Sequence, residues 1–207
     1  MPKTFADQVI NFTRNLQPPD IPLPPDFEWL FPYSEPETMS ALTAFYQKYY
    51  ADKQTRHFLF GINPGRFGAG ITGVPFTDPV RLETECGIEN NFPKKQELSA
   101  QFVWLFINAY GGAEVFCRKF YITSISPLGF TKNGVNINYY DDRRLLQAAE
   151  PFIVWNIRTQ LEFGAHRDAA ICIGEGQNFK VFKKLNAKHG FFREVIPLSH
   201  PRFVMQY

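Results

Sequence analysis

Apolar residues recur along the chain with two different periods, which predict helices that alternate with short strands. Phe5, Val9, Phe12 and Leu16 follow helical spacing, so we expect a helix over 4–17 with Thr4 as its N-cap. The apolar run 57–62 ends in a glycine–proline turn, which is typical of a buried parallel strand. Further strands are expected over 119–126, 169–173 and 194–197, and further helices over about 37–50, 98–109, 141–163 and 177–188.

Prolines modify this pattern at three points. Residues 17–36 hold seven of the 16 prolines, so they cannot form a helix or a central strand, and we expect extended chain packed on the surface by its aromatic residues. Ser-Glu-Pro-Glu at 34–37 predicts a capping box that opens the next helix. Pro151 interrupts 141–163, which is therefore expected to form two helices.

Strands separated by helices predict right-handed crossovers and an α/β fold, with a mostly parallel sheet covered by helices on both faces. In such sheets the ligand crevice lies at the carboxyl ends of the strands. The segments that follow the predicted strands are therefore the candidates for a functional site. They are residues 63–76, 124–130, 174–180 and 199–207.

Composition bounds the size and the class of the protein. A chain of 207 residues, 44% of them hydrophobic, fits one domain over 1–207, with residues 1–50 packed on a core of 56–202. The formal net charge of +2 excludes a histone-like protein. Residues 151–207 nevertheless carry eight basic and four acidic side chains, so an anionic partner is expected to bind in this part of the chain.

Cysteine spacing and hydropathy indicate the compartment. Cys86, Cys117 and Cys172 form no CxxC pair, which argues against a disulfide framework, a cysteine-ligated zinc and an iron–sulfur cluster. No apolar run approaches ~20 residues, and the first residues do not read as a signal peptide. We therefore expect a cytoplasmic protein that is neither secreted nor bound to a membrane.

The segment after the first predicted strand is rich in glycine. Residues 61–76 read G-I-N-P-G-R-F-G-A-G-I-T-G-V-P-F, and their five glycines let backbone N–H groups approach a ligand closely. The loop has neither the GK[ST] of a phosphate-binding loop nor the spacing GxGxxG. A Rossmann nucleotide site is therefore disfavoured.

This loop resembles the first motif of the uracil-DNA glycosylase superfamily. It is most similar to the single-strand-selective monofunctional uracil-DNA glycosylases, whose motif has the form G-x-N-P-G-x-F-G-x-x-x-T-G-V-P-F, and departures from that family's pattern point to a divergent bacterial branch. I-P-L-S-H-P-R at 196–202 resembles the second motif, and 120–128 and 170–176 resemble the strands between the two motifs. The resemblance spans residues 56–202.

The resemblance implies a three-layer αβα sandwich around a four-stranded, mostly parallel sheet. It implies a monofunctional glycosylase of base-excision repair that hydrolyses the N-glycosidic bond of a flipped deoxyuridine in DNA. Asn63 corresponds to the catalytic asparagine that positions water, and His200 to the histidine that stabilises the leaving base. Without the motifs, Asn63 would close its own turn, and His200 would be an ordinary packed histidine, as we expect of the chain's other histidines.

The resemblance also assigns residues to the base, and three of them depart from the family's pattern. Phe76 corresponds to the aromatic ring that stacks on the base, and Gly65 to a position where backbone N–H groups contact it. Ser124 stands where the family has an asparagine that reads uracil, Arg66 replaces a proline, and Ala69 replaces a larger apolar residue beside C5. A glycosylase for xanthine or hypoxanthine therefore stays open as an alternative.

Binding of DNA is expected to involve the end of the chain. Arg202 and Phe203, with the two residues that follow, are candidates for a wedge inserted into DNA, and Lys180 lies on a basic helix that could contact phosphates. The expected partner is uracil-containing DNA, single- or double-stranded, bound by a nucleoid-associated monomer without metal or cofactor. The motif loop has no lysine for a Schiff base, which argues against lyase activity. A catalytically silent nucleic-acid-binding module and a hydrolase of small nucleotides are the remaining alternatives.

Overall fold

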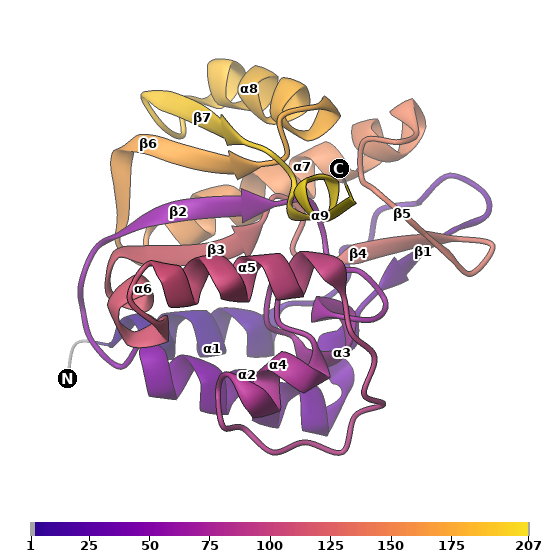
Figure 1. Cartoon of the computed structure of the whole chain (residues 1–207). Coiled ribbons are helices and arrows are strands. Elements are labelled where there is room, and N and C mark those ends of the chain that lie inside the picture. The colour runs from indigo at the N-terminus through magenta and orange to yellow at the C-terminus, as the bar shows by residue number, and fades with distance from the viewer. Residues whose placement is uncertain (1–2, 207) are drawn as a thin grey trace.

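A four-stranded parallel sheet forms the centre of the molecule in the computed structural model, which describes residues 3–206 (Figure 1). The strand order is β3-β2-β6-β7, and all neighbours are parallel, so the predicted fold class is confirmed. In chain order these strands are β2 (Arg56–Gly61), β3 (Phe120–Ser124), β6 (Ala165–Ile173) and β7 (Glu194–Leu198). Gly61 pairs with Ser124 and Ile173 with Leu198, so the carboxyl ends meet at one edge of the sheet.

Helices cover both faces of this sheet. Successive side chains of a strand point to opposite faces. Phe60 packs against Phe182 of α8, with ring centroids 4.9 Å apart. Leu59 faces the other layer, where Phe106 of α5 and Phe116 of α6 lie. The helices are α1 (Phe5–Asn15), α2 (Pro36–Tyr49), α3 (Ala69–Thr72), α4 (Pro79–Thr84), α5 (Leu98–Ala109), α6 (Ala113–Lys119), α7 (Arg143–Leu161), α8 (Gln177–His189) and α9 (Pro201–Gln206).

The N-terminal helix is anchored to the sheet through a buried arginine. Arg56 is fully buried, and its guanidinium lies 4.5 Å from the ring centroid of Phe5 and 4.8 Å from that of Tyr50. The same guanidinium forms an ion pair with Asp52 at 2.7 Å. Arg56, the first residue of β2, thus connects the amino-terminal end of the sheet with α1 and with Tyr50, which directly follows α2.

Two details of the helix ends test the predicted caps. Thr4 Oγ1 accepts the N–H of Asp7 at 3.1 Å, and the carboxylate of Asp7 accepts the N–H of Thr4 at 2.8 Å, so the predicted N-cap of α1 is confirmed. The predicted capping box at 34–37 is wrong. Ser34 Oγ donates to the carbonyl of Phe31, and no side chain among the described residues caps α2, which begins at Pro36.

The predicted break at Pro151 is also wrong, because α7 runs without interruption from Arg143 to Leu161. Pro151 has no N–H to donate to the preceding turn, which weakens a helix interior. A long buried face outweighs this loss, since Leu145, Ala149, Ile153 and Ile157 are all fully buried. Packing against the sheet therefore keeps the two halves of the helix in line.

A second, three-stranded antiparallel sheet lies beside the main one (Figure 1). Its order is β1-β4-β5, and β1 confirms extended chain for Phe27–Leu30 of the proline-rich segment 17–36, whereas Pro32–Ser34 of that segment forms a short 3-10 helix. Trp29 of β1 packs on Phe130 of β4, with ring centroids 4.8 Å apart. The β4–β5 hairpin, which turns at Asn133 and Gly134 with positive φ, was not predicted. The strands are β1 (Phe27–Leu30), β4 (Gly129–Lys132) and β5 (Val135–Ile137), and the turn η1 (Pro32–Ser34) follows β1.

Candidate active site

A cavity of about 210 Å³ lies at the carboxyl ends of the strands, and most of the predicted site residues line it. Asn63 comes from the loop after β2, Ser124 from the end of β3, and His200 from the segment after β7. The structure therefore brings the two sequence motifs to a single cavity. The predicted residues that line it are Asn63, Gly65, Ala69, Phe76, Ser124, His200 and Arg202.

The amide of Asn63 is held in one orientation by the backbone around it. Its Oδ1 accepts the N–H of Tyr139 at 3.0 Å, and its Nδ2 lies 3.4 Å from the carbonyl oxygens of Pro64 and Ile137. If the amide were flipped, its NH₂ group would face the N–H of Tyr139 and its oxygen would face the two carbonyl oxygens, and both pairings are unfavourable. Asn63 thus offers a neutral oxygen acceptor at a fixed place.

His200 is held as a neutral imidazole with a defined tautomer. Its Nδ1 accepts the backbone N–H of Arg202 at 3.2 Å, so the proton of the neutral ring is assigned to Nε2. Burial, and to a smaller extent the charge of Arg202, lower the pKa of His200 below that of an ordinary histidine. At neutral pH the ring therefore carries one N–H donor and no charge.

Phe76 forms an aromatic wall of the cavity and has an unusual backbone. Its φ of 51° is in the left-handed region, which bulky residues seldom adopt. Thr72, which is fully buried, stabilises this bend by donating its hydroxyl to the carbonyl of Thr77 at 2.6 Å. The ring lies 6.4 Å from that of His200 between centroids, and it packs so closely on Gly61 that a Cβ there would be 2.9 Å from Phe76 Cε2.

Ser124 is fixed at the end of β3 by a buried amide. The side chain of Asn156 on α7 is fully buried, and its Nδ2 donates to the carbonyls of Ser124 at 3.3 Å and Ile125 at 3.0 Å. Ser124 itself is 9% exposed. Its short side chain therefore meets the cavity from a rigid backbone.

The other predicted residues do not line this cavity. The guanidinium of Arg66 donates to the carbonyl of Gly134 in the β4–β5 turn. Lys180 is exposed on α8. Phe203 is 57% exposed on α9, one residue after Arg202.

The cavity also contains residues that sequence reasoning missed. Glu97, Ser99 and Asn138 all line it. The pKa of the Glu97 carboxyl is raised, chiefly by burial and then by the charge of Asp78. Glu97 and Ser99 lie at the start of α5 and Asn138 directly follows β5, all outside any motif, and no local pattern pointed to them. They add a carboxylate, a hydroxyl and an amide to the site.

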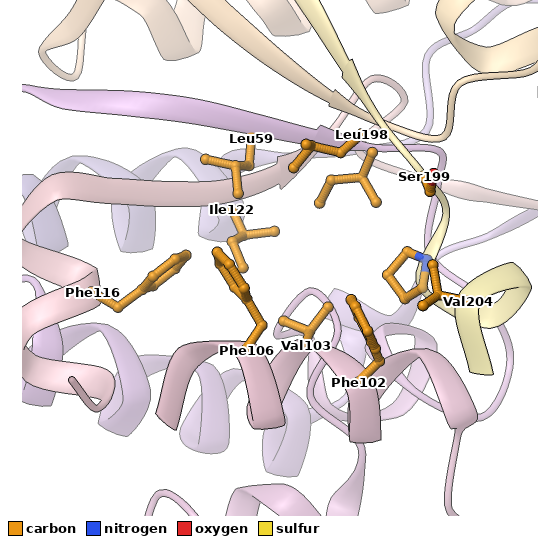
Figure 2. A pocket seen from close by; sticks show the side chains of 11 residues that line it. Leu59, Phe102, Val103, Phe106, Phe116, Ile122, Leu198, Ser199 and Val204 are labelled. Atoms are coloured by element: carbon orange, nitrogen blue, oxygen red, sulfur yellow. The ribbon is translucent and has the colours of Figure 1, made fainter. Parts of the chain in front are cut away.

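A second, larger cavity is apolar and lies between α5 and the sheet. It measures about 310 Å³, and every described residue that lines it except Ser199 is apolar. Figure 2 shows Phe102 and Phe106 rising from α5 toward Leu59 and Leu198, with Ser199 and Val204 at one end. The hydroxyl of Ser199 is hydrogen-bonded to Glu175 at 3.1 Å. This cavity supplies few polar groups for catalysis, in contrast to the cavity around Asn63.

Within residues 3–206, no group of three or more His, Cys, Asp or Glu side chains is arranged to hold a metal ion. No helix in that part of the chain is both long and apolar enough to span a bilayer.

Comparison with known proteins identifies a family and a closely similar solved structure. Residues 47–207 match the family model of the uracil DNA glycosylase superfamily. The crystal structure of wild-type SMUG2 from Pedobacter heparinus is 49% identical, with a TM-score of 0.95, over 99% of this chain and 90% of that chain. Among curated proteins, none matches the sequence significantly. The likeness to SMUG2 agrees with the resemblance found in the sequence motifs.

Proposed function

This chain belongs to the uracil-DNA glycosylase superfamily and is a DNA glycosylase, and we propose that it removes uracil by hydrolysing the N-glycosidic bond of deoxyuridine. One observation carries this proposal. Asn63 and His200, which are far apart in the sequence, line the same cavity together with Phe76 and Ser124. A water acceptor, an N–H donor and a stacking ring are the groups that cleavage of a flipped nucleotide requires.

In the proposed reaction Asn63 acts on the sugar side of the breaking glycosidic bond and His200 acts on the base side. A neutral amide is a weak base, so the bond between C1′ and N1 breaks well ahead of water attack. The electron pair leaves with uracil, and the Nε2–H of His200 stabilises the charge that develops on O2. Asn63 Oδ1 holds the water whose oxygen then bonds to the oxocarbenium carbon. That water keeps one proton as the new hydroxyl on C1′ and releases the other to solvent, because the amide of Asn63 is too weak a base to take it. The uracil anion takes up a proton from solvent.

A second candidate substrate is a deaminated purine. Ser124 and Ala69 both line the cavity and are small, which supports room beside the base edge for xanthine or hypoxanthine. Oligonucleotides that carry uracil, xanthine or hypoxanthine distinguish the two. Equal or faster release of a purine would overturn the uracil assignment. Ser124→Asn should raise the ratio of uracil to xanthine excision, because an amide offers both a donor and an acceptor to uracil; an unchanged ratio would contradict the role given to Ser124.

DNA is the proposed polymer, and it would approach the cavity past α9. Arg202 lines the cavity, and the exposed Phe203 follows it, which supports contact with the strand on either side of the flipped nucleotide. Lys180 is exposed on α8 and does not line the cavity, so it is proposed only for contact with phosphates outside the cavity. We also propose that the enzyme is a monomer and has no lyase activity.

Cleavage of a single-stranded oligonucleotide with one uracil tests the proposal. After incubation, hot alkali breaks the strand wherever a base has been lost. The wild type and His166→Gln, a control at the other end of the sheet, should cut the strand, whereas Asn63→Ala should bind it with similar affinity and leave it intact. Binding without cleavage by the wild type would instead indicate a catalytically silent module, and release of uracil from deoxyuridine monophosphate alone would indicate a hydrolase of small nucleotides.

A further inference from the structure

A chain of buried and partly buried hydrogen bonds connects Asn63 to the end of β6. Asn63 Oδ1 accepts the backbone N–H of Tyr139 at 3.0 Å. The phenol of Tyr139 donates to Oδ1 of Asn178 at 2.8 Å, and Nδ2 of Asn178 donates to the carbonyl of Ile173 at 3.1 Å. The chain thus passes from the loop after β2, through the segment after β5 and the first turn of α8, to the end of β6.

The same chain ends against the segment that carries His200. Gly174 follows Ile173, and its N–H donates to the carbonyl of Leu198 at 2.7 Å. Gly174 has a φ of 115°, and a Cβ at this position would lie 3.5 Å from Asn178 Cβ and 3.8 Å from His200 Cδ2. Asn178 and Gly174 are therefore packed close to His200, which lies two residues after the end of β7.

Burial makes this chain sensitive to the loss of any one partner. Tyr139 is 0% exposed and Asn178 is 2% exposed. Buried polar groups are unfavourable unless they are hydrogen-bonded. A set of buried polar side chains with all hydrogen bonds made fixes one geometry, whereas a pair of apolar side chains could pack in several arrangements. The phenol of Tyr139 is thus anchored. The backbone N–H of Tyr139 makes a hydrogen bond of 3.0 Å to the Asn63 amide, which is shorter than the two contacts of 3.4 Å that this amide makes with carbonyl oxygens.

We propose that Tyr139 and Asn178 are positioning residues of the glycosylase, which hold the Asn63 oxygen at a set place relative to His200. This inference rests on the function proposed for Asn63 and His200. Tyr139 acts through its backbone N–H, and its phenol keeps that N–H in place by means of Asn178. A shift of Asn63 by a fraction of an ångström would misplace the water, while the stacking ring and the rest of the cavity stay unchanged.

Removal of the phenolic oxygen tests this role. Tyr139→Phe should lower the single-turnover rate about tenfold and leave the dissociation constant for DNA unchanged, since the cavity wall is preserved. Tyr50→Phe is the matched control. Its phenol is also buried and donates to the carbonyl of Phe120 at 3.2 Å, far from the cavity, so it should lose stability without losing rate. A Tyr139→Phe rate equal to that of Tyr50→Phe would overturn the inference.

A double variant separates positioning from stability. Tyr139→Phe with Asn178→Leu replaces both partners by apolar groups of similar shape, which is often nearly neutral for folding. The carbonyl of Ile173 loses its bond from Asn178, so the double variant should melt somewhat below the wild type. At a temperature where it is fully folded it should still cleave about tenfold more slowly; wild-type cleavage would refute the proposal. In an Asn63→Ala background Tyr139→Phe should cause no further loss of the residual rate, and a further tenfold loss would show that Tyr139 does not act through Asn63.

These ratios can be measured on whichever base the wild type releases. Failure of the wild type to release uracil would therefore overturn the proposed substrate alone. Equal rates for the variant and the wild type on an active substrate would overturn the role of Tyr139 and Asn178 alone.

Discussion

Replacement of Gly61 by alanine is expected to impair catalysis by moving Phe76. An added Cβ would lie 2.9 Å from Phe76 Cε2 and 3.2 Å from Phe76 Cζ. The shorter distance is roughly 0.6 to 1 Å below the optimum for two carbon atoms, so the ring must shift by about that amount. The side chain sits on a backbone with a φ of 51°, and the ring borders the cavity, so the shift narrows the space for the base.

The expected loss follows from this displacement. A misplacement of about 1 Å can reduce catalysis about a hundredfold, so a shift of roughly 0.6 to 1 Å should lower kcat/KM by about tenfold to a hundredfold, or about 1.4 to 2.7 kcal/mol. Overpacking should also lower the free energy of unfolding by about 1 kcal/mol. Because Phe76 is assigned to stacking on the base, the rise in KM should exceed the fall in kcat.

Steady-state cleavage of a short uracil-containing strand measures the effect. Gly176→Ala is the control, because the space around a Cβ at Gly176 is open to 4 Å and its φ is negative. The control should cleave like the wild type. If Gly61→Ala also matched the wild type in kcat and KM, the reasoning about Phe76 would be refuted.

Two further predictions concern pH and stability. Burial and the charge of Arg202 lower the pKa of His200, so the neutral ring persists below pH ~6.5. The cleavage rate should therefore stay level from pH 8 to pH ~6.5 and fall only in more acid solution. A rate that already falls between pH 8 and pH 7 would contradict this. Asp52→Ala leaves the buried Arg56 without its carboxylate, so urea unfolding should show a loss of about 2 to 3 kcal/mol with kcat almost unchanged. A loss below about 0.5 kcal/mol would contradict the anchoring role of Arg56.

Elements with a regular pattern or a run of apolar residues were predictable from the sequence, and the shortest helices were not. The four strands of the main sheet and the helices of ten or more residues repeat their apolar positions often enough to be recognised. The helices α3, α4 and α9 are only four to six residues long and have no such repeat. Asn133-Gly134 was an available hairpin signal. Pro151 was misleading because burial of α7 outweighs a local preference.

The site was predictable only where a motif supplied the residues. The loops at 61–76 and 196–202 gave Asn63 and His200, and the rule for parallel sheets gave their common edge. Glu97 and Asn138 reach the cavity through tertiary packing of segments that carry no motif. The hydrogen bond from Tyr139 to Asn63 is made by a backbone N–H, which any residue type could donate. Such contacts leave no trace in residue identity.

The central claim is that Asn63 and His200 act on one flipped base in the cavity at the strand ends. The most direct measurement is a crystal structure of the Asn63→Ala variant bound to a single-stranded oligonucleotide with one uracil. The account predicts uracil stacked on Phe76, with His200 Nε2 within hydrogen-bond distance of O2 and Ser124 at the opposite edge of the base. A base bound outside the cavity, or a cavity closed to the base while DNA occupies the surface, would contradict it.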